Sequence, residues 1–259
     1  DIVLEKDKGL ETAEIFLHVY SKMTDDPKRK KLLACITHGQ NTDKWGEQCC
    51  PFFYGFYTFQ EEYEGVDHFL ENTLSNCSRK ITNILSDLSL VTLYSQNICI
   101  SYEEMANRLE IENFCYLEII DSLGESIIRI MNQRERGFRI CHPLIAKKVL
   151  EQIYEGKNNR LYMATINYIN RMRSIYGNEE TNYIDMVFRE LFIDRSYIDG
   201  EKQSFSEIIE DIPGQLHKKQ VFEHLIKLYP ENPHYYNHLG RLEAYEAYKN
   251  FKQFESAIA

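Results

Sequence analysis

The sequence predicts a mainly α fold with one small β-hairpin, and three observations support this prediction. Residues that break helices are scarce, with 12 glycines and 6 prolines among 259 residues. Apolar residues recur at helical spacing along most of the chain, and two β-rich runs occur close together near residues 127–141. The apolar content of 43% is sufficient for buried cores, which excludes a disordered chain.

Residues 1–80 are predicted to form helices around a cluster of aromatic side chains. Apolar side chains at helical spacing predict a helix over 11–23, and a basic run then opens a second helix that ends near Ile36. The segment 51–59 contains six aromatic residues, which we interpret as a packing cluster between helices. A third helix is expected to direct four side chains inward: Val66, Phe69, Leu70 and Thr73.

The middle of the chain, residues 81–155, begins with a helical stripe that is followed by a short extended piece over 97–100. Ser101 and Glu104 have the spacing of a capping box, in which each side chain bonds the backbone N–H of the other residue. This spacing predicts the start of a second helix. A third helix from Asn113 is expected to bury three apolar side chains: Phe114, Leu117 and Ile120.

A β-hairpin and a final helix complete this region. The β-rich runs 127–131 and 138–141 are joined by a polar stretch that ends at Gly137, which predicts two strands around a turn. Pro143 then opens a helix at its first position, where the missing N–H of proline is not needed. The order helix, strand, helix, helix, hairpin, helix predicts a winged helix with a small β-hairpin.

Charge argues against nucleic acid as a partner of this winged helix. The chain has 30 Lys and Arg against 40 Asp and Glu, which gives a net charge of −10. The predicted third helix contains Glu118 and Asp121 without Lys or Arg, so its carboxylates would face the phosphates of DNA. We therefore expect no sequence-specific DNA binding.

Two further features concern the cellular compartment. No run approaches the ~18–20 apolar residues that a membrane span requires, so we expect no membrane span. The seven cysteines are odd in number and have no repeating spacing. This pattern predicts reduced thiols in a cytoplasmic protein rather than a disulfide framework.

Few residues carry a signal for chemistry. The Gly-rich phosphate loop, the nucleophile elbow and the His-Glu-x-x-His zinc motif are all absent, so the chain contains no catalytic motif. His234 and His238 have a spacing that can chelate a metal, but they lack a third ligand nearby, so we expect packing and no bound metal. His142 precedes Pro143 at a helix start, where partial positive charge and N–H groups suit a phosphate. A structural helix cap is the alternative role of His142.

The end of the chain resembles tetratricopeptide repeats. A helix ending in Leu228-Tyr229-Pro230 is followed by a new helix that contains Leu239-Gly240, as at the junction of two such repeats. Another helix is expected from Asn250. Because these repeats bury their apolar faces only by stacking, we expect further repeats beyond Ala259.

Two segments resemble the STAND P-loop NTPases, signal-transduction ATPases related to the NACHT and NB-ARC proteins. Residues 139–146 resemble the winged-helix motif of that family, in which a histidine contacts the β-phosphate of ADP, and this implies a nucleotide contact for His142. Residues 50–57 resemble the family's lid segment, whose proline packs on adenine, and this implies the same role for Pro51. Segments after Phe192 resemble bacterial anti-phage STAND proteins and animal antiviral proteins with sterile-alpha-motif domains.

From this resemblance, we predict that the chain consists of four segments. They are a helical lid-like segment over 1–80, a winged-helix domain over 81–155, a helical linker over 156–216 and the start of a tetratricopeptide-like α-solenoid over 217–259. The chain begins at Asp1 and lacks the P-loop, so we expect it to be part of a longer protein. Binding of ATP or ADP, and any ATPase activity, would require an upstream P-loop domain.

The resemblance implies the regulatory and sensor part of a STAND-type NTPase switch in innate immune or anti-phage defence. In such a switch, nucleotide and a protein ligand on the repeats control assembly into a homo-oligomer. Two alternatives remain open: a winged-helix transcription regulator with a helical-repeat sensor, and a plain repeat adaptor for protein binding. A DNA-binding assay tests the transcription-regulator alternative. A plain repeat adaptor would give residues 139–146 and the aromatic segment no function.

Overall fold

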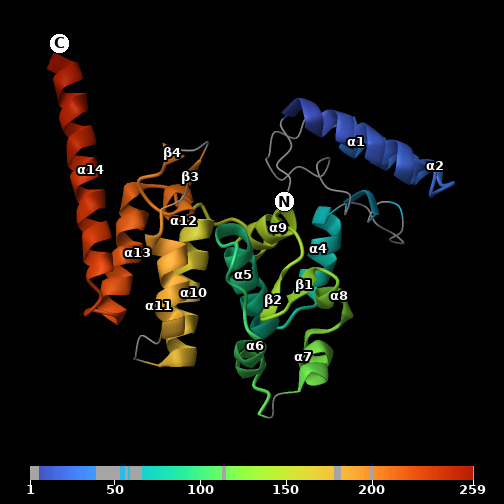
Figure 1. The fold of residues 1–259 in the computed structure, drawn as a ribbon, viewed down its shortest axis with the longest axis horizontal. Helices are drawn as coiled ribbons and strands as arrows, with labels where there is room; N and C mark the ends of the chain where they lie inside the picture. The colour runs from blue at the N-terminus through green and yellow to red at the C-terminus, as the bar shows by residue number, and fades with distance from the viewer. Residues whose placement is uncertain are drawn as a thin grey trace.

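The chain is mainly α, as predicted. The computed structural model describes residues 6–38, 53–55, 58, 66–112, 115–177, 182–195, 197–198 and 201–258. Across these residues, helices are supplemented by two small antiparallel sheets of two strands each (Figure 1). No helix in this part of the chain is both long and apolar enough to cross a membrane.

The N-terminal helices pack around buried aromatic side chains. Helices α1 (Lys6–Ser21) and α2 (Pro27–His38) contact each other, and α4 (Val66–Ser75) follows. Phe53 and Tyr54 are completely buried, and the ring of Phe16 on α1 meets the ring of Tyr54 edge-on at 5.3 Å. The predicted aromatic packing cluster is therefore confirmed for these two residues.

The region after α4 follows the predicted order of helices and hairpin, with one additional short helix, α8, before the hairpin. Helix α5 spans Arg79–Tyr94, α6 Tyr102–Leu109, α7 Tyr116–Leu123, α8 Glu125–Ile128, β1 Met131–Arg134, β2 Gly137–Ile140 and α9 Pro143–Ile153. Helix α5 packs against α9 and against β2, so the hairpin and the last helix both pack on the same helix. Pro143 stands at the start of α9, as expected.

The position of the hairpin differs from the prediction. Of the run 127–131, Ile127 and Ile128 lie in the short helix α8, and β1 begins only at Met131 and continues into the stretch predicted to be a turn. Arg134 pairs with Gly137, so the turn contains two residues. Ile127 is buried through a helical turn, and periodicity alone cannot distinguish such a short buried helix from a strand.

Gly137 is required where the hairpin meets the preceding extended segment. Ile100 forms an antiparallel bridge with Phe138, and the backbone of Gly137 has φ of +152°. A Cβ atom at position 137 would lie 2.0 Å from the carbonyl oxygen of Ile100. Only glycine allows this close approach of the two backbones.

The buried face of α7 was also predicted wrongly. Leu117 is 68% exposed, whereas Ile119 and Leu123 are buried. Ile120 is half-buried against the core, as predicted, and Phe114 lies outside the described residues. The helix begins at Tyr116, and its core face follows the i, i+4 pair Ile119 and Leu123 rather than the stripe through Leu117.

The C-terminal part is a further set of helices. Helix α10 spans Arg160–Tyr176, α11 Asn182–Phe188, the π-helix η2 Arg189–Ile193, β3 Tyr197–Ile198, β4 Glu201–Lys202, α12 Glu207–Asp211, α13 Gln215–Leu228 and α14 Pro233–Ile258. Helices α13 and α14 pack side by side, and Figure 1 shows α14 continuing well beyond the end of α13. The predicted new helix at Asn250 is wrong, because α14 runs through this position without a break.

Helix α5 is shared by two hydrophobic cores. Ile84 and Leu88 belong to the first core, which contains the aromatic pair from residues 53–54 and the winged-helix elements. Leu90 and Val91 belong to the second core, whose members extend along the chain as far as Leu242. The second core thus joins residues of the winged helix, the predicted linker and the first predicted repeat.

Candidate functional site

His142 is the last residue before α9 and caps this helix with its own side chain. Its backbone is extended, with φ −148° and ψ 139°, and its Nδ1 accepts a hydrogen bond of 3.1 Å from the N–H of Leu144. Pro143 fixes the first helical φ and carries no N–H. The sequence placed His142 correctly at the helix start, and the capping role is confirmed.

The hydrogen bonds of this cap engage backbone N–H groups at the start of α9 that could otherwise bind an anion. Helix N-termini attract anions because the first N–H groups lack partners inside the helix. Here Leu144 donates to the His142 ring and Ala146 donates to the His142 carbonyl oxygen at 3.1 Å. Two N–H groups near the start of α9 are therefore already engaged by His142 itself.

The imidazole of His142 is a neutral donor. Burial lowers the pKa of His142 to about 4, so the ring is uncharged near pH 7. Since Nδ1 is the acceptor for Leu144, the ring proton lies on Nε2. The ring proton therefore lies on the side of the imidazole opposite the helix.

The structure brings the aromatic segment against His142. The ring of Phe53 meets the imidazole edge-on, with 5.0 Å between ring centroids and an interplanar angle of 84°. Phe53 is completely buried, so it holds the imidazole from the side of the core. Pro51 lies outside the described residues.

Arg139 ties the hairpin to the C-terminal end of α5. Its guanidinium donates to the carbonyl oxygens of Gln96 at 2.6 Å and Thr92 at 3.2 Å, and also to that of Ser95. The last carbonyls of a helix lack partners and carry partial negative charge, so a cation is favourable there. This contact fixes β2, and with it the position of His142 two residues after the strand.

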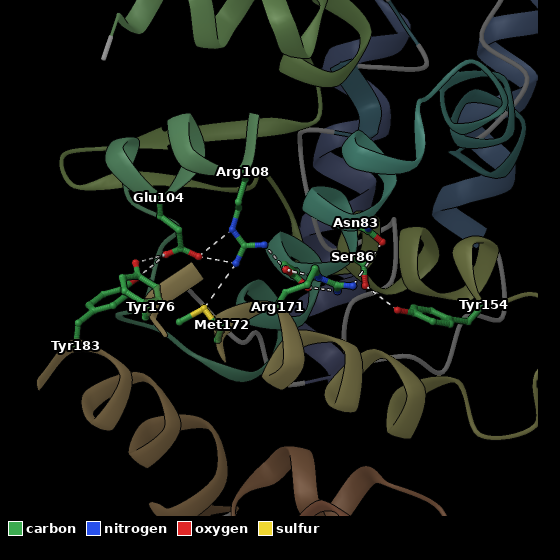
Figure 2. Close-up of polar contacts among 10 residues, drawn as sticks. Asn83, Ser86, Glu104, Arg108, Tyr154, Arg171, Met172, Tyr176 and Tyr183 are labelled. Atoms are coloured by element: carbon green, nitrogen blue, oxygen red, sulfur yellow. Dashed lines mark hydrogen bonds and ion pairs between the residues drawn. The ribbon is translucent and has the colours of Figure 1, made fainter. Parts of the chain in front are cut away.

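A buried ion network connects α5 with α6 and α10 (Figure 2). Asp87 is completely buried and accepts hydrogen bonds from Arg108 on α6 and from Arg171 on α10, the latter through Nε at 2.9 Å. Arg108 also donates through Nε to Glu104 at 2.9 Å. Two carboxylates and two guanidinium groups therefore balance one another in the interior.

Two tyrosine hydroxyls also donate hydrogen bonds to Glu104. Tyr183 and Tyr176 donate their hydroxyls to Oε2 of Glu104 at 3.1 Å and 3.3 Å (Figure 2). Burial and this carboxylate raise the pKa of both tyrosines, so they remain protonated donors. The network links the winged helix to α10 and to α11.

The predicted capping box is only half correct. Ser101 accepts a 3.0 Å hydrogen bond from the N–H of Glu104, as an N-cap residue should. The carboxylate of Glu104 is directed to Arg108 and the tyrosines instead of returning to Ser101. Sequence reasoning missed this network, although Asp87 gave a signal as an acid inside the apolar run 84–91.

The described residues contain no group of His, Cys, Asp and Glu side chains suited to hold a metal ion. The five cysteines among these residues are thiols rather than disulfide-bonded. Comparison with protein-family models, curated proteins and solved structures finds no match for this chain.

Proposed function

We propose that this chain is the regulatory and sensor part of a cytoplasmic STAND-type NTPase switch in innate immune or anti-phage defence. Its P-loop domain would lie upstream, His142 and Pro51 would contact the bound ATP or ADP, and a protein ligand would bind the helical repeats. The active form would be a homo-oligomer. No metal is required from this chain.

One observation carries the proposal. The two segments that resemble the STAND family, residues 50–57 and 139–146, lie about 90 positions apart in the sequence. They meet in the fold through the contact between Phe53 and His142. A nucleotide contacted by both segments requires this proximity, whereas a plain repeat adaptor gives no reason for it.

The geometry suggests how the histidine would act. The imidazole is neutral and caps α9 through Nδ1, so its proton lies on Nε2; in the ADP-bound protein this Nε2–H would donate to a phosphate oxygen. A hydrogen bond to a charged partner contributes about 1.5–3 kcal/mol, which corresponds to a factor of roughly ten to one hundred in an equilibrium constant. This contact would favour the resting, ADP-bound state.

The surface of α14 supports a protein ligand on the repeats. Four large aromatic side chains along this helix are about half exposed or more: Tyr236, Tyr245, Tyr248 and Phe251. Tyrosine and other aromatics are enriched in the centres of protein interfaces. The acidic α7, in contrast, gives no support to the transcription-regulator alternative.

The test uses the full-length protein and separates capping from nucleotide contact. His142→Ala removes both functions, whereas His142→Asn keeps a capping oxygen and removes the distal donor. We expect both variants to retain roughly ten- to one-hundredfold less ADP and to assemble without ligand. Nucleotide content after purification and oligomer size by light scattering are the measurements.

Ser101→Ala is the matched control, because it removes an N-cap bond of similar length from α6. This variant should retain ADP as the wild type does. If His142→Asn also retains ADP normally, His142 is a helix cap alone and the proposal fails. The coding sequence before Asp1 gives an independent check, since it should encode a P-loop and a Walker B motif.

A further inference from the structure

Helix α7 presents an acidic surface with an apolar side chain in it. Residues 109–128 contain five Asp or Glu and no Lys or Arg. Leu117 is 68% exposed, and Glu118 and Asp121, which lie beside it on the helix, are exposed as well. Among the described residues, no cation forms a salt bridge with either of these two acids. This face of α7 is therefore suited to a basic partner.

A basic surface with a hollow in it lies where α1 ends and α2 begins. Residues 22–31 contain five Lys or Arg and two Asp. The hollow measures about 340 Å³ and is lined by Glu14, Leu17, His18, Ser21, Lys22 and Lys30. Lys22 and Lys30 are exposed, and in the part of the chain that the structure describes no acid pairs with them. The hollow thus combines an apolar side chain, Leu17, with two ammonium groups.

The acids around this hollow leave its positive charge in excess. Asp26 lies 3.5 Å from the guanidinium of Arg29, and Glu14 lies 3.5 Å from Nδ1 of His38. Even with Asp25 and Asp26 included, cations outnumber acids between residues 22 and 31. Because the chain as a whole has a net charge of −10, this segment differs in sign from most of the molecule.

The two surfaces lie at opposite ends of the part of the molecule that is built around the first core. Figure 1 shows α1 and α2 at the top of the view and α7 at the bottom, with α4 between them. The acidic surface can therefore reach the hollow of another copy, but not that of its own chain. A contact between two unlike surfaces is heterologous, so it repeats from copy to copy into a ring or a filament.

We propose that α7 of one copy docks into the hollow between α1 and α2 of a second copy. Leu117 enters the hollow beside Leu17, and Glu118 and Asp121 pair with Lys22 and Lys30. The opposite signs of the two surfaces favour this pairing over contact between like surfaces. The proposal rests on the homo-oligomer of the proposed function and adds the surfaces through which the copies meet.

The experiment measures self-association of the full-length protein by light scattering over a range of concentrations, at low ionic strength. Two double variants each reverse one surface: Lys22→Glu with Lys30→Glu, and Glu118→Lys with Asp121→Lys. Each variant alone should associate roughly tenfold to a hundredfold more weakly, because like charges then face each other. An equal mixture of the two should regain association, since each reversed surface then meets its reversed counterpart.

Lys157→Glu with Arg160→Glu is the matched control. Both cations are exposed and lie at or just before the start of α10, and their reversal changes the net charge as much as that of the two lysines at the hollow. This variant should associate as the wild type does. Leu117→Asn should weaken association, and its 68% exposure makes it a test of the contact rather than of the core.

A monomeric wild type, or a mixture that associates no better than its components, would overturn the proposal. ADP retention separates this outcome from failure of the proposed function. A failed mixture together with reduced ADP in His142→Asn rejects the interface alone. A restored mixture together with normal ADP in His142→Asn rejects the nucleotide contact alone.

Discussion

Two buried polar regions, the ion network around Asp87 and the surroundings of His238, differ in how well their polar atoms are paired. Around Asp87, two acids and two arginines balance each other, and two tyrosines satisfy the remaining oxygen of Glu104. At His238, in contrast, Nδ1 of the ring is buried between the rings of Phe222 and Phe205 and has no hydrogen-bond partner in the described part of the chain. Satisfied interior charges hold helices together, whereas an unpaired buried nitrogen lowers stability and is kept in place by the packing around it.

The largest expected effect comes from breaking the balanced network. Arg108→Met leaves Asp87 and Glu104 buried with part of their partners removed. We expect a loss of about 3–5 kcal/mol in the free energy of unfolding, measured by urea denaturation.

Lys80→Met is the control for this change, since it breaks an exposed ion pair with Glu110 at 2.7 Å. Its effect should stay within about 1 kcal/mol. Similar losses in both variants would contradict the distinction between the interior network and surface pairs.

The pH dependence of stability tests the two buried histidines. Burial lowers the pKa values of His142 and His238 to about 4, below their ordinary value of 6.5. Between these values the unfolded chain binds more protons, so stability should rise with pH from about 4 to 6.5 and fall as the pH is lowered. Urea titrations across this range should show a shallower rise for His238→Phe.

The cap at α9 provides an intermediate case, in which a buried histidine has a protein partner. His142→Ala should lower the free energy of unfolding by about 0.5–2 kcal/mol because Leu144 loses its acceptor. His142→Asn should lose less. Equal losses in thermal unfolding would show that packing against Phe53, rather than capping, is the main contribution.

Removing an exposed charge should hardly affect folding. Arg195 follows η2 and is exposed, so Arg195→Gln should change the free energy of unfolding by less than about 0.5 kcal/mol, measured by urea denaturation. A larger loss would show that Arg195 contributes to the fold.

The smallest expected signal is in DNA binding. Helix α7 has the sequence YLEIIDSL, with two acids and no Lys or Arg. A gel-shift titration with random duplex pools should yield no sequence-specific complex at physiological salt. A nanomolar, sequence-dependent shift would favour the transcription-regulator alternative.

The sequence predicted helix starts better than it predicted buried polar contacts. Ser101 and Pro143 act locally, so their effect is visible in neighbouring residues. The partners of Asp87 come from α6 and α10, and no local pattern encodes such a distant pairing. The strand β1 was displaced for a related reason, because burial of Ile127 depends on the assembled core.

The candidate nucleotide site was predictable in part. The position of His142 before a proline showed that it would begin a helix, but its contact with Phe53 depends on tertiary packing. The nucleotide role of both His142 and Pro51 stays a prediction, as do the four proposed segment boundaries. His238 was expected to pack, and its ring does pack against Phe222.

The π-helix η2 affects where Arg195, which follows it, lies on the molecule. Its backbone closes with a bond from the N–H of Asp194 to the carbonyl oxygen of Arg189, one residue wider than an α-helical turn. Such a bulge is equivalent to a single inserted amino acid. Deleting one residue between Arg189 and Ile193 would restore an α-helical turn and rotate the next segment of the chain by about 100° about the helix axis. Relatives that differ by this one residue would therefore carry the arginine on a different side of the molecule.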